Sequence, residues 1–271
     1  MILNKSSFSN ITLSVPPKAS WPEIGRVLSA YDDLIENNRR RIELLEQSAR
    51  LLYKEWFVHL RFPGHEHVKI VDGVPEGWER KPFPELVDFK EGPGLRNHQY
   101  RDAGIPFLNI RTFADDEIDL SKAKCIDESE VEARYQHFLL EADDHVVSSS
   151  GTLGRLVTIR ACHLPVMLNT SLIRMRPKSN MKKWFLKAYL KHGDFIDQAR
   201  SMATGAAQLN YGPSHLKMMT VLTPTSSLVE MFEDHAEPIY EQIKDLLDSN
   251  RKLSAARDIL LPRLMNGEIA V

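Results

Sequence analysis

The stretch LSAYDDLIENNRRRIELLEQSARLLYKEW, residues 28–56, decides the fold of this 271-residue chain. Its apolar residues recur at alternating steps of three and four, the heptad spacing of a helix that packs against another helix. Neither glycine nor proline interrupts it. The positions on this seam are Leu28, Tyr31, Ile35, Asn38, Ile42, Leu45, Ala49, Leu52 and Trp56. The pattern predicts a long helix over residues 21–62, preceded by an N-terminal segment over 1–20.

The phrase DLIENNRR at 33–40 returns near the other end of the chain as DLLDSNRK at 245–252. The second copy lies on its own seam and predicts a second long helix over 225–271. An asparagine interrupts each seam at the same point, and a polar residue on an apolar seam fixes register and partner. We expect antiparallel packing through Leu28, Ile35, Asn38, Ile42, Leu45 and Leu52 on one helix and Ile243, Leu246, Asn250, Leu253 and Leu260 on the other. Two unrelated surface helices are the alternative.

The middle of the chain has a different residue pattern, in which glycines, prolines and runs of β-branched residues replace the heptads. Residues 63–75 read as a linker and 76–224 as one mixed α/β globular domain. Strands are expected at 105–110, 145–150, 156–160 and 168–176, and a helix with an internal glycine at 184–202. The expected fold class is α+β: this domain plus two long helices in an antiparallel coiled coil.

A short strand that ends in proline precedes each long helix, ITLSVPP at 11–17 and MTVLTPT at 219–225. The second closes the middle domain. The first reads as the end of a domain that the chain does not contain.

Composition sets limits on the class of protein. The net charge of −2 does not by itself indicate a nucleic-acid partner, and two cysteines fit a reducing compartment. No apolar run approaches the roughly 20 residues that cross a bilayer, and the N-terminus lacks the apolar core of a signal peptide. We therefore expect a cytoplasmic protein with no membrane partner.

Charge is segregated along the middle domain. Residues 113–144 contain eleven acidic and three basic side chains, whereas residues 145–222 contain two acidic and eleven basic ones. The second part could form a basic face that holds phosphates. An equally good interpretation is a solvated helix face made mainly of Lys182, Lys183, Lys187 and Lys191.

Known catalytic patterns are missing from the sequence. It contains no G-x-x-x-x-G-K-[ST] phosphate loop, no G-x-G-x-x-G after a strand and no G-x-S-x-G elbow. Asp72 with Glu79 and Lys81 resembles a metal-dependent nuclease signature, but turn-forming residues surround it. His65 and His67 read as solvent-exposed loop residues. We expect a binding protein without its own active site or metal, rather than an enzyme.

Seven segments together resemble the specificity subunits of Type I restriction–modification systems. They are 28–64, VPEGWE (74–79), GIPFLNIRT (104–112), VVSSSGTLGR (146–155), LNTSLIRMRP (168–177), GAAQLN (205–210) and LLPRLMNGEI (260–269). The resemblance implies a target-recognition domain that reads half of a split double-stranded DNA sequence. It also implies helices that act as a spacer and as a dock for methylation subunits.

The same resemblance assigns catalysis to partner subunits. A methylation subunit would use S-adenosylmethionine and a restriction subunit ATP and Mg²⁺, so no cofactor is expected in this chain. With one recognition domain, the chain resembles a half-sized or truncated specificity subunit. A homodimer, or a second half-subunit, would supply the other half-site, and two-fold symmetry would predict a split palindromic target.

Candidate DNA-binding residues follow from side-chain chemistry. Arg, Asn and Gln can make bidentate contacts to base edges, whereas Ser, Thr and Lys suit phosphates. The candidates are Arg96, Asn97, His98, Tyr100, Arg111, Thr112, Ser149, Ser150, Thr152, Arg155, Thr204, Gln208, Asn210, Tyr211 and Lys217. A local backbone hydrogen bond is the plain alternative for Asn169 and Gln208. The alternative function is a coiled-coil interaction or scaffold protein with a protein- or glycan-binding domain.

Overall fold

The computed structural model describes residues 15–114, 117–179, 181–202 and 210–270. The chain forms two compact units, one of residues 1–45 with 242–271 and the other of residues 46–241. Two long helices, α2 (Trp21–Tyr53) and α8 (Ser226–Met265), each contribute to both units. The globular unit is thus larger than the expected domain over 76–224, because it includes a stretch of each helix.

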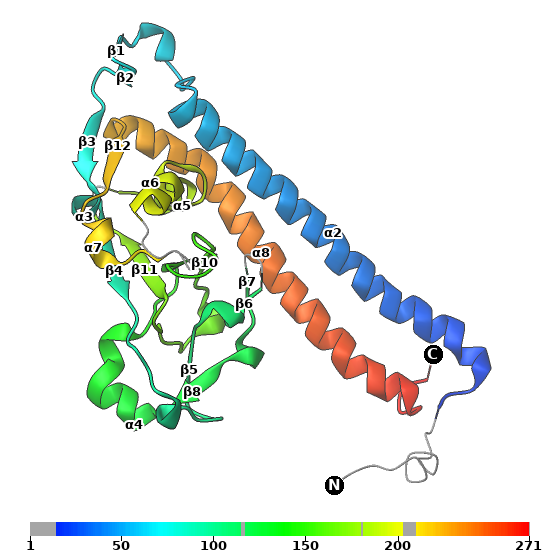
Figure 1. Cartoon of the computed structure of the whole chain (residues 1–271). Coiled ribbons are helices and arrows are strands. Elements are labelled where there is room, and N and C mark those ends of the chain that lie inside the picture. The colour runs from blue at the N-terminus through cyan, green and yellow to red at the C-terminus, as the bar shows by residue number, and fades with distance from the viewer. Residues whose placement is uncertain (1–14, 115–116, 180, 203–209, 271) are drawn as a thin grey trace. The chain divides into compact units, whose positions relative to one another are not determined.

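The first unit is an antiparallel pair of helix segments (Figure 1). Asn38 contacts Asn250, and Asp32 accepts a hydrogen bond from Arg257 at 2.6 Å. Because the position on α8 rises as the position on α2 falls, the two segments run in opposite directions. The seam positions of this unit are all buried or half-buried: Leu28, Ile35, Asn38, Ile42, Leu45, Ile243, Leu246, Asn250, Leu253 and Leu260. The expected fold class, with its antiparallel long helices, is confirmed.

Helix α2 ends earlier than the sequence pattern predicts. After Tyr53 a wider π-type turn runs over Lys54–Val58, where His59 N donates to Lys54 O at 2.8 Å. Leu60 then takes a left-handed conformation with φ of 58°, and Pro63 follows. Both residues oppose continuation of a helix to residue 62. At the other end of the chain, α8 stops at Met265, just before Gly267 with φ of 78°.

A four-stranded antiparallel sheet lies at the centre of the globular unit, in the order β10-β9-β11-β4. The strands are β10 (Leu156–Thr158), β9 (His145–Ser148), β11 (Leu172–Pro177) and β4 (Val87–Glu91). Strand β9 has neighbours on both sides and all four of its residues are buried. Because successive side chains point to opposite faces, both faces of β9 are covered, which is why two apolar residues, Val146 and Val147, follow one another there.

Four smaller strand pairs surround this sheet. They are β1 (Ile70–Val71) with β2 (Val74–Pro75), β3 (Glu79–Pro82) with β12 (Thr220–Thr223), β5 (Ile105–Phe107) with β8 (Lys124–Ile126), and β6 (Phe113–Ala114) with β7 (Glu117–Ile118). The strand expected over 105–110 ends at Phe107, because the Asn109 side chain accepts from Arg111 N and starts a tight turn. The segment expected to be a linker contains the β1–β2 hairpin.

The helix expected over 184–202 is two helices, α5 (Lys183–His192) and α6 (Phe195–Met202). They separate at Gly193, where a side chain would meet the Tyr53 hydroxyl at 2.8 Å and the Tyr189 ring at 2.9 Å. Three further helices are single turns: α3 (Phe83–Leu86), α4 (Glu128–Glu130) and α7 (Pro213–Leu216).

Helix α5 is fixed to α8 by an acidic cap and an aromatic cluster. The Glu233 carboxylate on α8 accepts from Trp184 N at 3.0 Å and from Phe185 N at 3.1 Å, which satisfies amide groups at the start of α5. Phe57 packs edge-on against Phe185 and Phe232 at centroid distances of 5.0 and 5.1 Å. These contacts hold the sheet-bearing part of the unit against its own helix stretches.

Candidate nucleic-acid interface

One end of the central sheet gathers four loops. In an antiparallel sheet, the ends of β4 and β9 lie beside the starts of β10 and β11. Ser149 N donates to Ser171 O at 2.9 Å, and Gly92 N donates to Leu172 O at 3.2 Å. Gly92 approaches the Asn169 backbone so closely that a side chain there would overlap it. Residues 91–95, 149–155 and 169–171 therefore lie next to one another.

A fourth segment, far away in the sequence, joins the same end. Asn210 forms an antiparallel bridge with Ser150, and Tyr211 N donates to Ser149 O at 3.0 Å. The Tyr211 hydroxyl donates to Ser148 O at 3.1 Å. We call residues 91–95, 149–155, 169–171 and 210–212 together the loop edge.

The β9–β10 hairpin of the loop edge is internally braced. The Ser148 hydroxyl donates to Thr152 O at 2.5 Å and accepts from Arg155 N at 2.9 Å. Gly151 and Gly154 supply the positive φ values, 72° and 77°, that the turn requires. The brace presents Ser150 and Thr152 on a defined turn.

The candidate residues of the loop edge differ in accessibility. Thr152 and Asn210 are exposed, and Ser150 and Arg155 are half-buried. The Arg155 guanidinium donates to Phe113 O at 3.0 Å and lies over the Phe113 ring, so its position is fixed. Asn169 is buried, and its side-chain oxygen accepts a hydrogen bond from Thr170 N at 2.8 Å. This is the local backbone hydrogen bond that the sequence suggested as the alternative to DNA contact.

Burial argues against three of the candidates. Thr112, Ser149 and Tyr211 keep 0%, 1% and 3% of their surface exposed. Thr112 donates its hydroxyl to Asn109 O at 2.7 Å, and Tyr211 uses its hydroxyl within the loop edge. The hydroxyls of Thr112 and Tyr211 donate to backbone carbonyls, and the backbone N and O of Ser149 pair with neighbouring segments, so burial counts against direct ligand contacts by these three. Residue type alone could not show whether a polar side chain bonds within the protein or to a ligand.

The other candidates lie on three separate turns. Arg96, Asn97 and His98 are exposed on a turn held by the buried Gln99, whose side chain accepts from Arg96 N at 2.8 Å. Tyr100 is half-buried and packs on Phe107, with 5.0 Å between ring centroids. Arg111 is exposed after β5 and Lys217 after α7. Thr204 and Gln208 lie outside the described residues.

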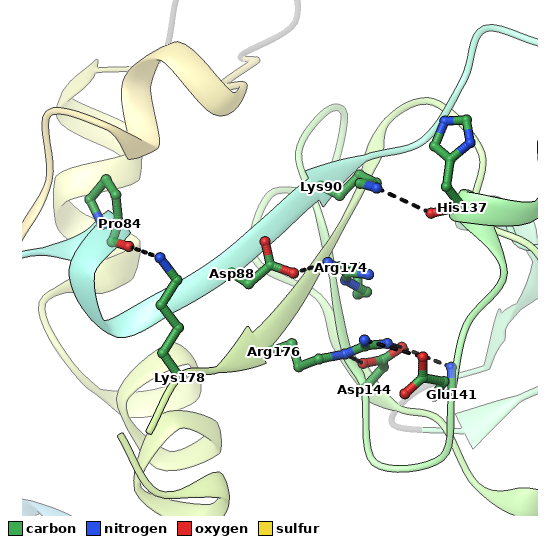
Figure 2. A network of polar contacts seen from close by, with 9 residues as sticks. All are labelled: Pro84, Asp88, Lys90, His137, Glu141, Asp144, Arg174, Arg176 and Lys178. Atoms are coloured by element: carbon green, nitrogen blue, oxygen red, sulfur yellow. Dashed lines mark hydrogen bonds and ion pairs between the residues drawn. The ribbon is translucent and has the colours of Figure 1, made fainter. Parts of the chain in front are cut away.

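Most of the segregated charge is paired inside the unit, as Figure 2 shows for one part of it. Arg176 on β11 makes two hydrogen bonds to the buried Asp144, at 2.7 and 2.8 Å, and Arg174 pairs with Asp88. Hydrogen bonding to Asp144 raises the pKa of Arg176, with burial opposing it. Lys183 pairs with Asp143 at 3.1 Å. Asp143 and Asp144 of the 113–144 stretch thus neutralise two bases of the 145–222 stretch, and Asp88 on β4 neutralises a third.

A second internal network joins β7 to the segment after β10. Glu117 pairs with the buried Arg160 and lies 3.2 Å from His163 Nε2. Arg160 N donates to His163 Nδ1 at 3.1 Å, so the ring proton is on Nε2 and is donated to the carboxylate. Burial would raise the pKa of Glu117, but the His163 hydrogen bond, the Ile118 amide and Arg160 together hold it below its usual value.

The lysines of α5 do not form the solvated face that the sequence allowed. Lys187 is buried, with its ammonium group 4.4 Å from the centre of the Tyr240 ring. Lys191 is half-buried and pairs with Glu46 of α2 at 2.7 Å. The arginines of β11 and these two lysines have internal contacts, so they do not contribute to a broad basic face. Arg200 and Lys217 are exposed, and Arg155 is half-buried.

Within the described ranges, no three His, Cys, Asp or Glu side chains come together in a way that could hold a metal ion. His65 and His67 are exposed on a turn. No helix among the described residues is long and apolar enough to cross a membrane.

The fold, a globular unit of mixed sheets and helices combined with two long antiparallel helices, is that of Type I specificity subunits of known structure. The match to the S subunit of a Type I restriction–modification system from M. genitalium spans 92% of this chain and 61% of that subunit, with a TM-score of 0.59 and 16% identity. The match to the HsdS subunit from Thermoanaerobacter tengcongensis spans 92% of this chain and 57% of that subunit, with a TM-score of 0.51 and 15% identity.

Sequence comparison leads to the same class, although no family model matches the chain. The Type I restriction enzyme MjaIX specificity subunit of Methanocaldococcus jannaschii is 25% identical over 99% of this chain and 63% of its own length. The HindI specificity subunit of Haemophilus influenzae is 25% identical over 97% of this chain and 70% of its own length. The chain is similar to these Type I specificity subunits and spans about two thirds of their length.

Proposed function

We propose that the chain recognises a DNA sequence, without catalysis, for a Type I restriction–modification complex. The observation that carries the proposal is the loop edge, where exposed hydroxyl and amide side chains lie on braced loops at one end of a sheet. Loops held by a rigid scaffold are the usual place for binding residues. The curated relatives support the proposal because they are specificity subunits by name.

The loop edge offers two kinds of contact to DNA. The exposed Asn210 can donate and accept at once, which suits the edge of an adenine. Ser150 and Thr152 suit phosphate oxygens and would set the register of the chain on the duplex. Arg96, Asn97 and His98 directly follow the first loop and extend the proposed surface, whereas Arg111 and Lys217 are candidates on separate turns.

The proposed surface is only modestly basic. Because six of the eleven arginines and lysines of the 145–222 stretch are ion-paired inside the unit, fewer cations of that stretch remain to neutralise phosphates. Affinity for random DNA should therefore be weak, since neutralised phosphates supply most nonspecific binding. Discrimination between sequences would have to come from base contacts.

The chain has one globular unit, so it would read one half of a divided target. A second copy of the chain, or a second half-subunit, would read the other half, and a two-fold pair would favour a palindromic target. The long helices would separate the two half-sites and hold the methylation subunits. S-adenosylmethionine, ATP and Mg²⁺ would act on those subunits and on the restriction subunit.

A scaffold protein with a protein- or glycan-binding domain was the other interpretation of the sequence. The relatives do not support it, and no contact in the described residues favours it.

The test is DNA binding by the chain with its methylation subunit. We expect fluorescence anisotropy to show salt-dependent binding to random duplexes, and methylome sequencing of cells with both proteins to reveal a split motif. Asn210→Ala with Thr152→Ala should weaken binding to that motif, whereas Ser121→Ala, an exposed residue on the β7–β8 connection, should not. No modified motif and no salt-dependent binding with the subunit present would overturn the proposal.

A further inference from the structure

Glu91 is an acidic residue at the loop edge without a countercharge. It is the last residue of β4, opposite Ile173 of β11, and it directly precedes Gly92. The side chain is half-buried, and its carboxylate has no hydrogen bond or ion pair within the part of the chain that the structure describes. Burial raises the pKa of this carboxyl group, and no charged neighbour is a cause of the shift.

The carboxylate points to the segment that joins the sheet from far away in the sequence. A side chain built on Gly212 would come within 3.8 Å of Glu91 Oε2. Gly212 follows Asn210 and Tyr211, which are bound to Ser150 and Ser149. Glu91 therefore lies among the loops of the loop edge, close to the exposed Asn210.

Other half-buried or buried carboxylates of the globular unit are treated differently. Glu117 is paired with Arg160 and His163, and Asp144 is paired with Arg176. Removing a charge from water is unfavourable unless a donor replaces the water. A carboxylate left without a donor at a ligand-facing edge is therefore an acceptor that the protein itself does not satisfy.

The chemistry of DNA limits what can satisfy it. Phosphate oxygens repel a carboxylate, so Glu91 would not help to bind the backbone. The exocyclic amino groups of bases donate in the major groove, and a carboxylate is the side chain that accepts from cytosine N4. Gly92, which follows Glu91 in the chain, and Gly212, which faces its carboxylate, have no side chains that would cover it.

We propose that Glu91 is a specificity-determining residue that accepts a hydrogen bond from the exocyclic amino group of a cytosine in the target half-site. The inference rests on the proposed function. One side chain would thus determine the preference for one base pair. Unlike a phosphate contact, the Glu91 contact would add discrimination between sequences, because the carboxylate repels the phosphates on which nonspecific binding depends.

The experiment uses the full chain with its methylation subunit and starts from the motif found for the natural sequence. Competition anisotropy compares duplexes that carry the motif with duplexes in which one base pair at a time is changed. Three proteins are measured: the natural chain, Glu91→Gln and Glu85→Gln. Glu85 is an exposed carboxylate on α3, so its variant makes the same charge change away from the loop edge.

We expect Glu91→Gln to lose roughly tenfold of the preference for cytosine at one position, because a good base contact provides discrimination of that order. Preference at the other positions and the melting temperature should stay unchanged, and binding to random DNA should not weaken. The glutamine amide suits adenine, so adenine should gain most at that position. Glu85→Gln should behave as the natural chain.

Two outcomes would overturn the inference while the proposed function stands. One is an unchanged preference at every position. The other is an equal loss at all positions together with a lower melting temperature, which would show that Glu91 supports the fold. If the natural chain itself shows no preferred sequence, the proposed function fails and the inference falls with it.

Discussion

The side-chain nitrogen of Asn38 on α2 donates a hydrogen bond to the side-chain oxygen of Asn250 on α8 at 2.9 Å. The two residues occupy the same position in the repeated phrase, and Asn38 is buried. Two polar side chains on an apolar seam can hydrogen-bond to each other only when the two helices pack in one particular register. The repeat in the sequence therefore corresponds to a direct contact in the structure.

Substitution of one partner should be worse than substitution of both. Asn38→Leu leaves the Asn250 side chain without its partner on the seam, and we expect a loss of about 1–3 kcal/mol in the free energy of unfolding. The double variant with Asn250→Leu should be at least as stable as the natural chain but less uniform in assembly. Denaturant unfolding and sedimentation velocity measure the two effects. Strong destabilisation by the double variant would count against the seam role.

The acidic cap between α8 and α5 gives a second prediction. Glu233→Ala removes the acceptor of two amide groups at the start of α5, and we expect a loss of about 1–2 kcal/mol in the free energy of unfolding. Glu230→Ala is the matched control, because this exposed residue lies one turn away and reaches Lys182 only at 3.9 Å. Equal effects of the two variants in thermal or denaturant unfolding would contradict the capping role.

The hairpin of the loop edge tests the importance of backbone conformation. Gly154 has φ of 77°, and a side chain there would overlap Ile196. Gly154→Ala should therefore lower the free energy of unfolding by about 1–3 kcal/mol and weaken binding to the motif. Gly94→Ala, in another loop of the same edge with open space around it, should leave stability within about 0.5 kcal/mol.

Acid should destabilise the protein through His145. This buried ring accepts from Thr158 at Nδ1 and donates from Nε2 to Lys183 O, and burial lowers its pKa from 6.5 to about 4, with Lys187 adding to the effect. Above pH 6.5 the ring is neutral in both states and its contribution is fully present. As the pH falls from 6.5 to about 4, the unfolded chain binds a proton that the folded chain does not, and stability falls by about 3 kcal/mol.

The measurement for His145 is the free energy of unfolding across this pH range in the natural chain and in His145→Gln. His192, whose pKa burial also lowers to about 4, remains in both proteins and contributes equally. The difference between the two curves should be flat above pH 6.5 and should change steadily below it. A constant difference over the whole range would contradict the prediction.

The sequence was sufficient for features that depend on periodicity. Heptad spacing predicted both long helices, because a helix that buries one face must repeat its apolar residues at that spacing. It did not predict the end of α2, since the π-type turn at Lys54–Val58 and the left-handed Leu60 depend on local packing. The seam continues in the sequence to Trp56, beyond the last α-helical residue.

The candidate site was only partly predictable. The hairpin at residues 149–155 was recognisable from its glycines and hydroxyls, but the burial of Ser149 and Tyr211 depends on pairing with a segment far away in the sequence. Counts of charged residues suggested a basic face. Such counts carry no information on which bases form ion pairs inside the folded unit. Glu91 was missed for the same reason. An acid at the end of a strand, directly before Gly-Pro-Gly, was the available signal.

The ion pairs between the acidic and basic stretches have a consequence for how the globular unit can change. Arg174 pairs with Asp88 on β4, Arg176 with Asp144 just before β9, and Arg160 with Glu117 on β7, all inside the same unit. The body of the unit thus remains electrically balanced whatever residues occupy the exposed loop positions. Under the proposed function, substitutions at Thr152 or Asn210 would alter the ligand preference without leaving an arginine of the sheet unpaired, so new preferences could arise at little risk to folding.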